Sequence, residues 1–189
     1  MFRKRATRVS VLLTVAASTV ALVLTVGAQA GQDNGDKTLV LQSVGPVALE
    51  QVSDDCFGFA ADLRSTNGRQ TGRVTSCIDN FDLGTVGGFV STGRLIFELP
   101  GGDLTADVTG HLSDPGTIDP FTTGPLALPP PLASPGDQFG TLASYGQVTG
   151  GTERFAKATG IVTNAGFIVD SEALELKWWN TIFVLDLHD

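Results

Sequence analysis

The residues best suited to acid–base or metal chemistry are scattered along this 189-residue chain. Asp54 and Asp55 are adjacent, and consecutive side chains of a strand point to opposite faces, so the two carboxylates cannot act as a pair. We interpret them as solvated turn residues. His188 lies in the last two residues, where chains fray, and His111 falls on an outward face. No ligand spacing supports a metal site, so we expect no metal and no cofactor.

The first thirty residues are predicted to be a signal peptide. Four basic residues open the chain, an apolar stretch runs from Val9 to Ala28, and small residues precede a cleavage position after Ala30. The stretch is longer than most signal sequences, so an uncleaved anchor is the competing interpretation. Residues 31–37 are predicted to form a flexible tail and residues 38–189 a single domain. The mature protein is then secreted, into the extracellular space or the cell wall.

The charge of the mature chain excludes two classes of partner. The leader holds four of the twelve basic residues and none of the twenty acids, so its removal lowers the formal charge from −8 to −12. Such a surface repels nucleic acids and anionic lipids. We therefore expect no nucleic acid as a partner, and no membrane once the signal peptide is cleaved.

Both cysteines, Cys56 and Cys77, remain after cleavage. An even pair in an oxidising compartment is typical of a disulfide. Closing a loop of about twenty residues would contribute on the order of 3 kcal/mol. A metal or redox role is the competing interpretation, and it is weakened by the absence of a CxxC motif from the sequence.

The pattern after the leader is that of an all-β protein. Short runs with alternating apolar residues are bounded by Gly, Asn, Asp and Pro, as in strands and hairpins. Asn67-Gly68 indicates a type I′ hairpin turn, and Pro100-Gly101-Gly102 a second hairpin. Eight strands joined by short connections favour a closed antiparallel up-and-down barrel, because closure removes exposed edges. The predicted strands are 37–44, 55–64, 70–79, 86–99, 102–112, 139–149, 157–168 and 174–187.

Alternation assigns an inner and an outer face to four of these strands. The inner face is aromatic and aliphatic, and the outer face carries ionisable residues such as Asp62, Arg94 and Asp107. The strand 157–168 does not resolve into faces. The residues that we expect to line a ligand lumen are Phe57, Phe59, Leu95, Phe97, Leu104, Tyr145, Trp179 and Phe183.

Polar groups on the inner face are sparse, which weakens the case for catalysis. The alternation places Ser91 and Thr181 inward, and Lys177 only near a rim. Tyr145, the one tyrosine, is a candidate for presenting a phenol to a ligand. The alternative is a tyrosine of the core or rim whose hydroxyl is already hydrogen-bonded.

Residues 113–138 interrupt the strand pattern. They hold seven of the nine prolines together with scattered Phe and Leu residues. A loop of this length in a compact domain is typically a lid, a binding arm or disordered. Its apolar residues favour a polyproline-like arm over a barrel mouth or against another subunit; a mobile excursion without a role is the alternative.

The segment from Gly150 to Gly160 is the most informative motif. It lies between two predicted strands and lacks a following helix or a Gly-Lys-Ser/Thr sequence, so it does not fit a phosphate cradle. We interpret it as a tight corner that depends on Gly150, Gly151 and Gly160, with Phe155 plugging the end of the barrel.

This corner resembles the Gly-Gly-Thr-Gly-x-Phe-x-x-Ala-x-Gly segment of the allene oxide cyclase and dirigent superfamily, including its bacterial barrel-like members. The stretch from Gly68 to Cys77 and the Gly-rich hairpin around Pro100 also resemble that family, and the likeness spans residues 38–187. Glu153 departs from it, standing where the family has a glycine.

The resemblance implies a calycin-like eight-stranded barrel, often trimeric, with an apolar cavity open at one end. In plant members this cavity cyclises an unstable fatty-acid epoxide or steers the coupling of phenolic radicals. No catalytic residue of the family can be matched to a position here, so the catalytic residues are unassigned.

Three functions follow from these observations. The first is a secreted barrel that binds a small apolar molecule in its lumen. The second is a cyclase or isomerase that acts by confining its substrate, which requires a polar group deep in the cavity. The third is a structural or interaction protein whose barrel is filled by its own side chains.

Overall fold

The computed structural model describes residues 36–83, 88–113, 116–117, 137–171 and 175–188. The predicted leader and most of the predicted tail lie outside these residues. The described part is all-β, with one short 3-10 turn. Its elements are β1 Lys37–Pro46, β2 Glu50–Ser53, β3 Cys56–Ser65, β4 Gln70–Leu83, β5 Phe89–Leu99, β6 Gly102–Leu112, β7 Gly116–Thr117, β8 Gln138–Gly151, η1 Glu153–Phe155, β9 Thr159–Asp170 and β10 Leu176–His188.

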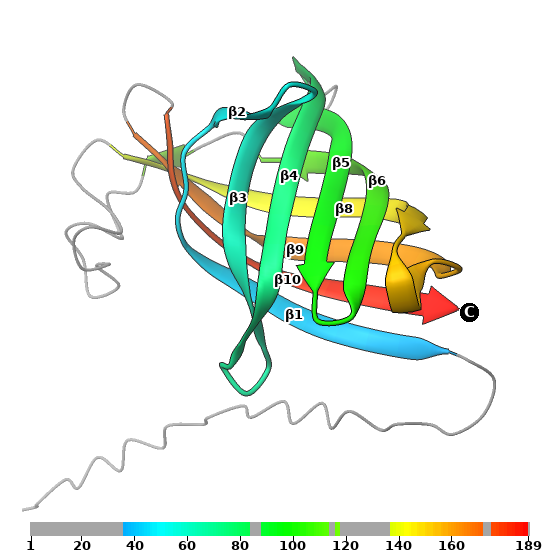
Figure 1. Ribbon diagram of the computed structural model, residues 1–189. Coiled ribbons are helices and arrows are strands. Elements are labelled where there is room, and N and C mark those ends of the chain that lie inside the picture. The colour runs from blue at the N-terminus through cyan, green and yellow to red at the C-terminus, as the bar shows by residue number, and fades with distance from the viewer. Residues whose placement is uncertain (1–35, 84–87, 114–115, 118–136, 172–174, 189) are drawn as a thin grey trace, which may run out of the picture.

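Eight of these strands close into an antiparallel barrel, as the sequence predicts (Figure 1). The order around the wall is β1-β10-β9-β8-β6-β5-β4-β3. The ring closes where β3 meets β1 at two residue pairs, Leu41 with Ser65 and Gln42 with Arg64. β2 lies outside the ring and pairs with β3 alone, and β7 pairs with β8.

Each of the eight predicted ranges corresponds to one barrel strand. The prediction missed the short strands β2 and β7, because runs of four and two residues are too short to show alternation. It also began the strand 157–168 too early. Residues 153–155 form η1, and β9 begins only at Thr159. The Pro-rich range 113–138 contains β7 and the first residue of β8, and its stretch 118–136 lies outside the described residues.

The hairpin at Asn67-Gly68 is present, but its turn differs from the predicted type I′. That turn needs positive φ at both central residues. Only Gly68 has a positive φ, of 80°. The connection from Ser65 to Gln70 is a four-residue loop in which the Asn67 side chain accepts hydrogen bonds from the Ser65 hydroxyl, at 2.6 Å, and the Arg69 amide, at 3.1 Å. The longer loop uses asparagine as an acceptor in place of a strained backbone.

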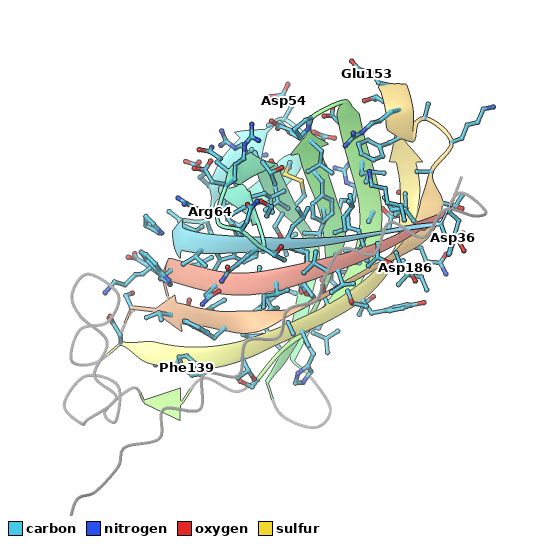
Figure 2. All side chains as sticks on the ribbon, turned by 90° about the horizontal axis from the view of Figure 1, so that it is seen from below. Asp36, Asp54, Arg64, Phe139, Glu153 and Asp186 are labelled. Atoms are coloured by element: carbon cyan, nitrogen blue, oxygen red, sulfur yellow. A yellow bond between two sulfur atoms is a disulfide. The ribbon has the colours of Figure 1, made fainter. Side chains whose placement is uncertain are left out.

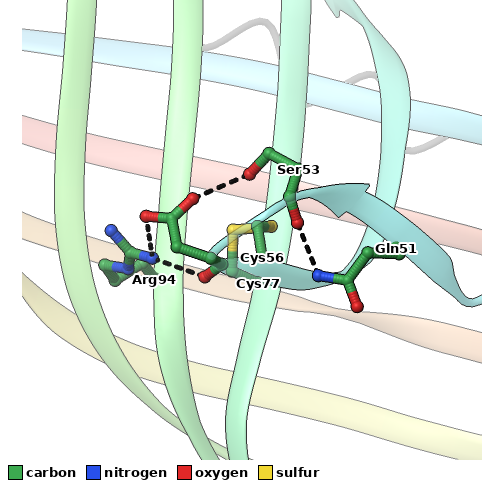
Figure 3. The surroundings of a disulfide bond; sticks show 6 residues. Gln51, Ser53, Cys56, Cys77 and Arg94 are labelled. Atoms are coloured by element: carbon green, nitrogen blue, oxygen red, sulfur yellow. Dashed lines mark hydrogen bonds and ion pairs between the residues drawn. A yellow bond between two sulfur atoms is a disulfide. The ribbon is translucent and has the colours of Figure 1, made fainter.

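The predicted disulfide between Cys56 and Cys77 is present, with the two Cα atoms 5.0 Å apart (Figure 3). It ties the beginning of β3 to β4. Asp54 and Asp55 lie in the exposed turn between β2 and β3, as expected. Arg94 of β5 pairs with the Asp55 carboxylate at 3.2 Å. Hydrogen bonds from Ser53 and Arg94, together with the Arg94 charge, lower the pKa of Asp55.

The corner after β8 seals one end of the barrel. Phe155 of η1 is buried in the main core cluster. The Asp103 amide donates to the Thr152 hydroxyl at 2.9 Å, and the Arg154 amide donates to the Gly101 carbonyl at 3.2 Å, so the corner is held on the hairpin between β5 and β6. Figure 2 shows Glu153, Asp36 and Asp186 at this closed end and Phe139 at the opposite, open end.

Two glycines of the corner are required by close backbone contacts. A Cβ on Gly151 would lie 2.3 Å from the Phe155 carbonyl oxygen. One on Gly160, whose φ is 143°, would lie 2.0 Å from the Asp186 carbonyl oxygen. A side chain on Gly150, by contrast, would meet nothing within 4 Å. Glu153 adopts a positive φ of 49°, a conformation that glycine adopts without strain.

Candidate ligand-binding cavity

The barrel interior consists of two halves, which we name the packed half and the hollow half. The packed half lies at the closed end, and its side chains are almost completely buried. Its residues are Leu63, Val74, Phe97, Leu104, Phe155, Phe183 and Leu185. The hollow half lies toward the open end and encloses a cavity of about 340 Å³. That volume falls at the lower end of the roughly 300–1,000 Å³ typical of small-molecule sites.

Seven barrel strands and one connecting segment line this cavity. Most of the lining is aliphatic or aromatic, and the polar exceptions are three serines, Asn164 and Asp170. The described lining residues include no lysine, arginine or histidine. The lining is formed by Leu49, Phe59, Ser76, Ile78, Phe81, Phe89, Ser91, Leu95, Val108, Gly110, Leu112, Leu142, Ser144, Asn164, Ile168, Asp170, Leu176 and Trp179.

Trp179 of β10 forms the boundary between the two halves. Its ring lines the cavity and packs edge-on against Phe59, with centroids 4.5 Å apart. It also contacts Phe183 at 5.8 Å, and Phe183 in turn packs against Phe97 at 5.3 Å. The indole N–H donates to the Ser43 hydroxyl at 3.0 Å, so this buried polar atom is satisfied. These contacts therefore hold the Trp179 ring, which forms the floor of the cavity, in one orientation.

The predicted lumen residues divide into three groups. Phe59, Leu95 and Trp179 line the cavity. Phe97, Leu104 and Phe183 also face inward, but they belong to the packed half beneath it. Phe57 and Tyr145 neither line the cavity nor belong to the packed half.

Phe57 is 49% exposed, contrary to its predicted place in the lumen. The ladder between β3 and β4 starts at Gly58 with Cys77, one residue further along β3. Phe57 pairs instead with Gln51 of the outer strand β2. The alternation was correctly identified, but Phe57 lies beyond the last residue that the neighbouring barrel strand covers.

Tyr145 is 53% exposed and lies on the outer face of the barrel, so its assignment to the lumen is wrong. It borders a shallow polar groove with Arg94, Asp107 and Gln147. The inward residues of β8 are the even-numbered ones, including Leu142 and Ser144. Glycine and alanine occupy both faces of β8, so its alternation is weak in the sequence.

β9 contributes the polar groups that the sequence did not reveal. Asn164 and Asp170 are both buried and line the cavity. The odd-numbered face of β9 carries more apolar side chains than this inner face, among them Ile161, Phe167 and Val169. At the open end Val169 on that face is buried in a second cluster with Phe139, Phe167 and Trp178. Because apolar residues occur on both faces of β9, no alternation marks its inner one.

Asp170 is an acid in a mostly apolar cavity. Asp170 is 8% exposed, and its side chain makes no hydrogen bond to another described residue. Desolvation by burial raises the pKa of this carboxyl from 3.8 to about 6. A carboxyl with such a pKa can take up and release a proton near neutral pH.

The other polar residues considered in the sequence analysis are engaged elsewhere or lie outside the cavity. Lys177 forms an ion pair with Asp137 at 2.6 Å. The Thr181 hydroxyl donates to the Ala165 carbonyl at 3.2 Å. His188 bonds to Asp36 at 2.8 Å at the closed end, and this hydrogen bond raises the pKa of His188. His111 is exposed and does not line the cavity.

Within the described ranges, no group of three or more His, Cys, Asp or Glu side chains is placed to hold a metal ion. Nor does any helix in that part of the chain have the length and apolar character needed to span a membrane. The chain matches no protein-family model and no curated protein.

Proposed function

We propose that this protein binds a small, mainly apolar molecule in the hollow half of its barrel. One observation carries the proposal: the cavity of about 340 Å³ with a predominantly apolar lining. A barrel interior that is not filled by its own side chains exposes apolar surface to water, and a ligand of matching chemistry gains free energy by covering it. The same cavity counts against the purely structural role, which requires a filled barrel.

Fluorescence of N-phenyl-1-naphthylamine tests this proposal, because the dye is uncharged, apolar and of suitable size. We expect saturable binding to the wild-type protein. Leu142→Trp, which adds bulk inside the cavity, should weaken binding by about tenfold or more. The matched control is Ala143→Trp on the next residue, which is exposed on the outer face. Absence of saturable binding, or equal effects of the two variants, would contradict the proposal.

A second candidate function is isomerisation or cyclisation of a reactive apolar substrate by confinement. It is favoured by the polar groups inside the cavity, Asn164 and Asp170, whose pKa burial raises to about 6. It also agrees with the resemblance to the allene oxide cyclase and dirigent superfamily, which remains a proposal. An unstable fatty-acid epoxide added to the protein should then yield one enantiomer of its cyclised product, and Asp170→Asn should return a racemic mixture. A racemic product with the wild-type protein would remove this candidate.

We further propose that the chain acts outside the cytoplasm after cleavage behind Ala30. The Cys56–Cys77 disulfide is compatible with an oxidising compartment. Mass spectrometry of protein recovered from the culture medium should give an N-terminus at Gly31. Recovery of the chain from the membrane fraction, with its leader intact, would support the anchor interpretation instead.

A further inference from the structure

Three of the polar residues that line the cavity lie in one row across its wall. In the strand register, Ser91 of β5 pairs with Gly110 of β6, Gly110 with Ser144 of β8, and Ser144 with Asn164 of β9. All four residues line the cavity. We name this set the polar row. The strand ladder places its members side by side, although they span 73 positions of the sequence.

Gly110 stands at the centre of the polar row. A Cβ at this position would lie 2.9 Å from the Ser91 hydroxyl oxygen, closer than packed side chains allow, and 3.5 Å from the Ser144 Cβ. Glycine at this position therefore leaves room for the Ser91 hydroxyl against the wall of the cavity.

The hydrogen bonds of the polar row leave donors unused. The Ser144 hydroxyl donates to the Asn164 side-chain oxygen. Among the described residues, neither the Asn164 amide nitrogen nor the Ser91 hydroxyl has a partner. Asn164 is only 7% exposed. No polar side-chain atom of the described residues is fully buried without a partner, so these donors open onto the cavity.

Two inward polar side chains that do not line the cavity, Ser43 and Thr181, are satisfied, unlike the donors of the polar row. Ser43 accepts from the Trp179 indole, and Thr181 donates to a backbone carbonyl. An amide in a site with little water gains from a hydrogen-bond partner that a ligand supplies. The Asn164 nitrogen and the Ser91 hydroxyl can both donate, so the complementary ligand group is an acceptor.

Charge narrows the class of acceptor. No basic side chain is present among the described lining residues to neutralise an anion, and Asp170 adds negative charge to the same cavity. Burying a carboxylate or phosphate there would be costly. An uncharged oxygen, such as that of a ketone, ester, ether or epoxide, meets the donors without this penalty.

We infer that the polar row recognises an uncharged oxygen acceptor on an otherwise apolar ligand. This inference rests on the proposed function and specifies its ligand class. Apolar surface of the cavity holds the body of the ligand, and Asn164 and Ser91 orient its oxygen. A hydrocarbon of the same shape leaves these donors unpaired.

Three compounds of one shape test the inference. Benzophenone carries a carbonyl where diphenylmethane has a methylene, and 4-benzoylbenzoate adds a carboxylate to benzophenone. Each is titrated at pH 8 against the protein loaded with N-phenyl-1-naphthylamine. Benzophenone should displace the dye at a concentration about tenfold lower than diphenylmethane, the effect of one hydrogen bond to a buried donor. The carboxylate should bind more weakly than benzophenone.

The variant Asn164→Leu isolates the amide. It should reduce the preference for benzophenone over diphenylmethane from about tenfold to about onefold, while diphenylmethane still binds. Asn180→Leu is the matched control, because Asn180 lies on the outer face of the barrel, in β10. Its side-chain oxygen accepts a hydrogen bond from the Gln42 side chain at 3.3 Å. The preference of this control variant should equal that of the wild type. Ser91→Ala, which removes a hydroxyl without a partner among the described residues, should lower the preference for benzophenone by about twofold. It serves as the test if Asn164→Leu does not fold.

The outcomes separate the inference from the proposed function. If folded Asn164→Leu keeps the wild-type preference for benzophenone over diphenylmethane, the inference is overturned and apolar binding is left intact. If Asn164→Leu does not fold, the same result with Ser91→Ala overturns the inference. Failure of the dye and all three compounds to bind the wild-type protein would overturn both. Irradiation of bound benzophenone adds a positional readout: labelled peptides should come from β5, β6, β8 or β9, and labelling confined to the outer face would also overturn the inference.

Discussion

The packed half and the hollow half are built by the same strands yet differ in what fills them. On β5, Phe97 faces the packed half and Ser91 the hollow half. On β10, Phe183 and Trp179 are almost completely buried. On β6 and β8, Gly110 and Ser144 leave it open. The comparison indicates that one end of the barrel carries the stability of the fold, which frees the other end to keep an unfilled space.

Removing a large side chain from the packed half should give the largest effect. Phe183→Ala should lower the free energy of unfolding by about 4 kcal/mol, because it removes buried apolar surface and leaves a cavity. Urea denaturation measures this loss. The matched control, Ile182→Ala on the outer face, should cost less than about 1 kcal/mol, since Ile182 is 49% exposed. Similar losses for Phe183→Ala and for Leu142→Ala in the hollow half would break the comparison.

The disulfide should contribute to stability without shaping the cavity. The double variant Cys56→Ser/Cys77→Ser opens a loop that spans 21 positions and should lower the free energy of unfolding by about 3 kcal/mol. Dye affinity measured well below the unfolding transition should stay within about twofold of the wild type. A large loss of affinity in folded protein would show that the hollow half depends on this link.

The buried charge of Asp170, in the hollow half, should lower the free energy of unfolding at neutral pH. The pKa of Asp170 is about 6 in the fold and 3.8 in the unfolded chain. As the pH rises, the Asp170 carboxyl therefore loses its proton in the unfolded chain before it does so in the folded one. The free energy of unfolding is not reduced by this group below pH 4, and the reduction grows as the pH rises through 6. A difference of about two pKa units corresponds to about 3 kcal/mol of unfolding free energy. Solvent in the open cavity screens the charge and reduces this loss to about 2 kcal/mol.

Asp170→Asn should accordingly stabilise the protein by about 2 kcal/mol at pH 7.5 and leave it unchanged at pH 3.5. Denaturation at the two pH values measures both quantities. Asp107→Asn removes the same charge from the outer face and is the control. A gain that is equal at both pH values would show that burial of the charge is not its cause.

The smallest effect concerns the corner that closes the packed half. Glu153→Gly should stabilise the fold by about 1 kcal/mol, because Glu153 has a positive φ of 49° that a glycine adopts without strain. Glu153→Ala keeps the strain and should give no gain. Thermal unfolding compares the two variants. A loss of stability with glycine would mean that contacts of the Glu153 side chain outweigh the backbone strain.

The sequence revealed the packed half more completely than the hollow half. Phe97 and Phe183 lie in strands whose ionisable residues, such as Glu98 and Asp186, fall on the opposite face, so their side could be assigned without a structure. Tyr145 lies in a strand of small residues and was placed on the wrong face. Asn164 lies in β9, whose two faces are both covered by apolar side chains near Val169. The polar row depends on register across four strands, and register between distant segments is not readable from one strand's pattern.

The way in which the wall closes has a consequence for access to the interior. Every other neighbouring pair of wall strands shares a long ladder, whereas β1 and β3 meet at only two residue pairs. This seam is the part of the wall that the fewest hydrogen bonds hold together, so it costs least to part. Leu49, from the segment that links β1 to β2, belongs to the cavity lining. The wall can therefore part most easily along this seam, while the long ladders hold the rest of the ring closed.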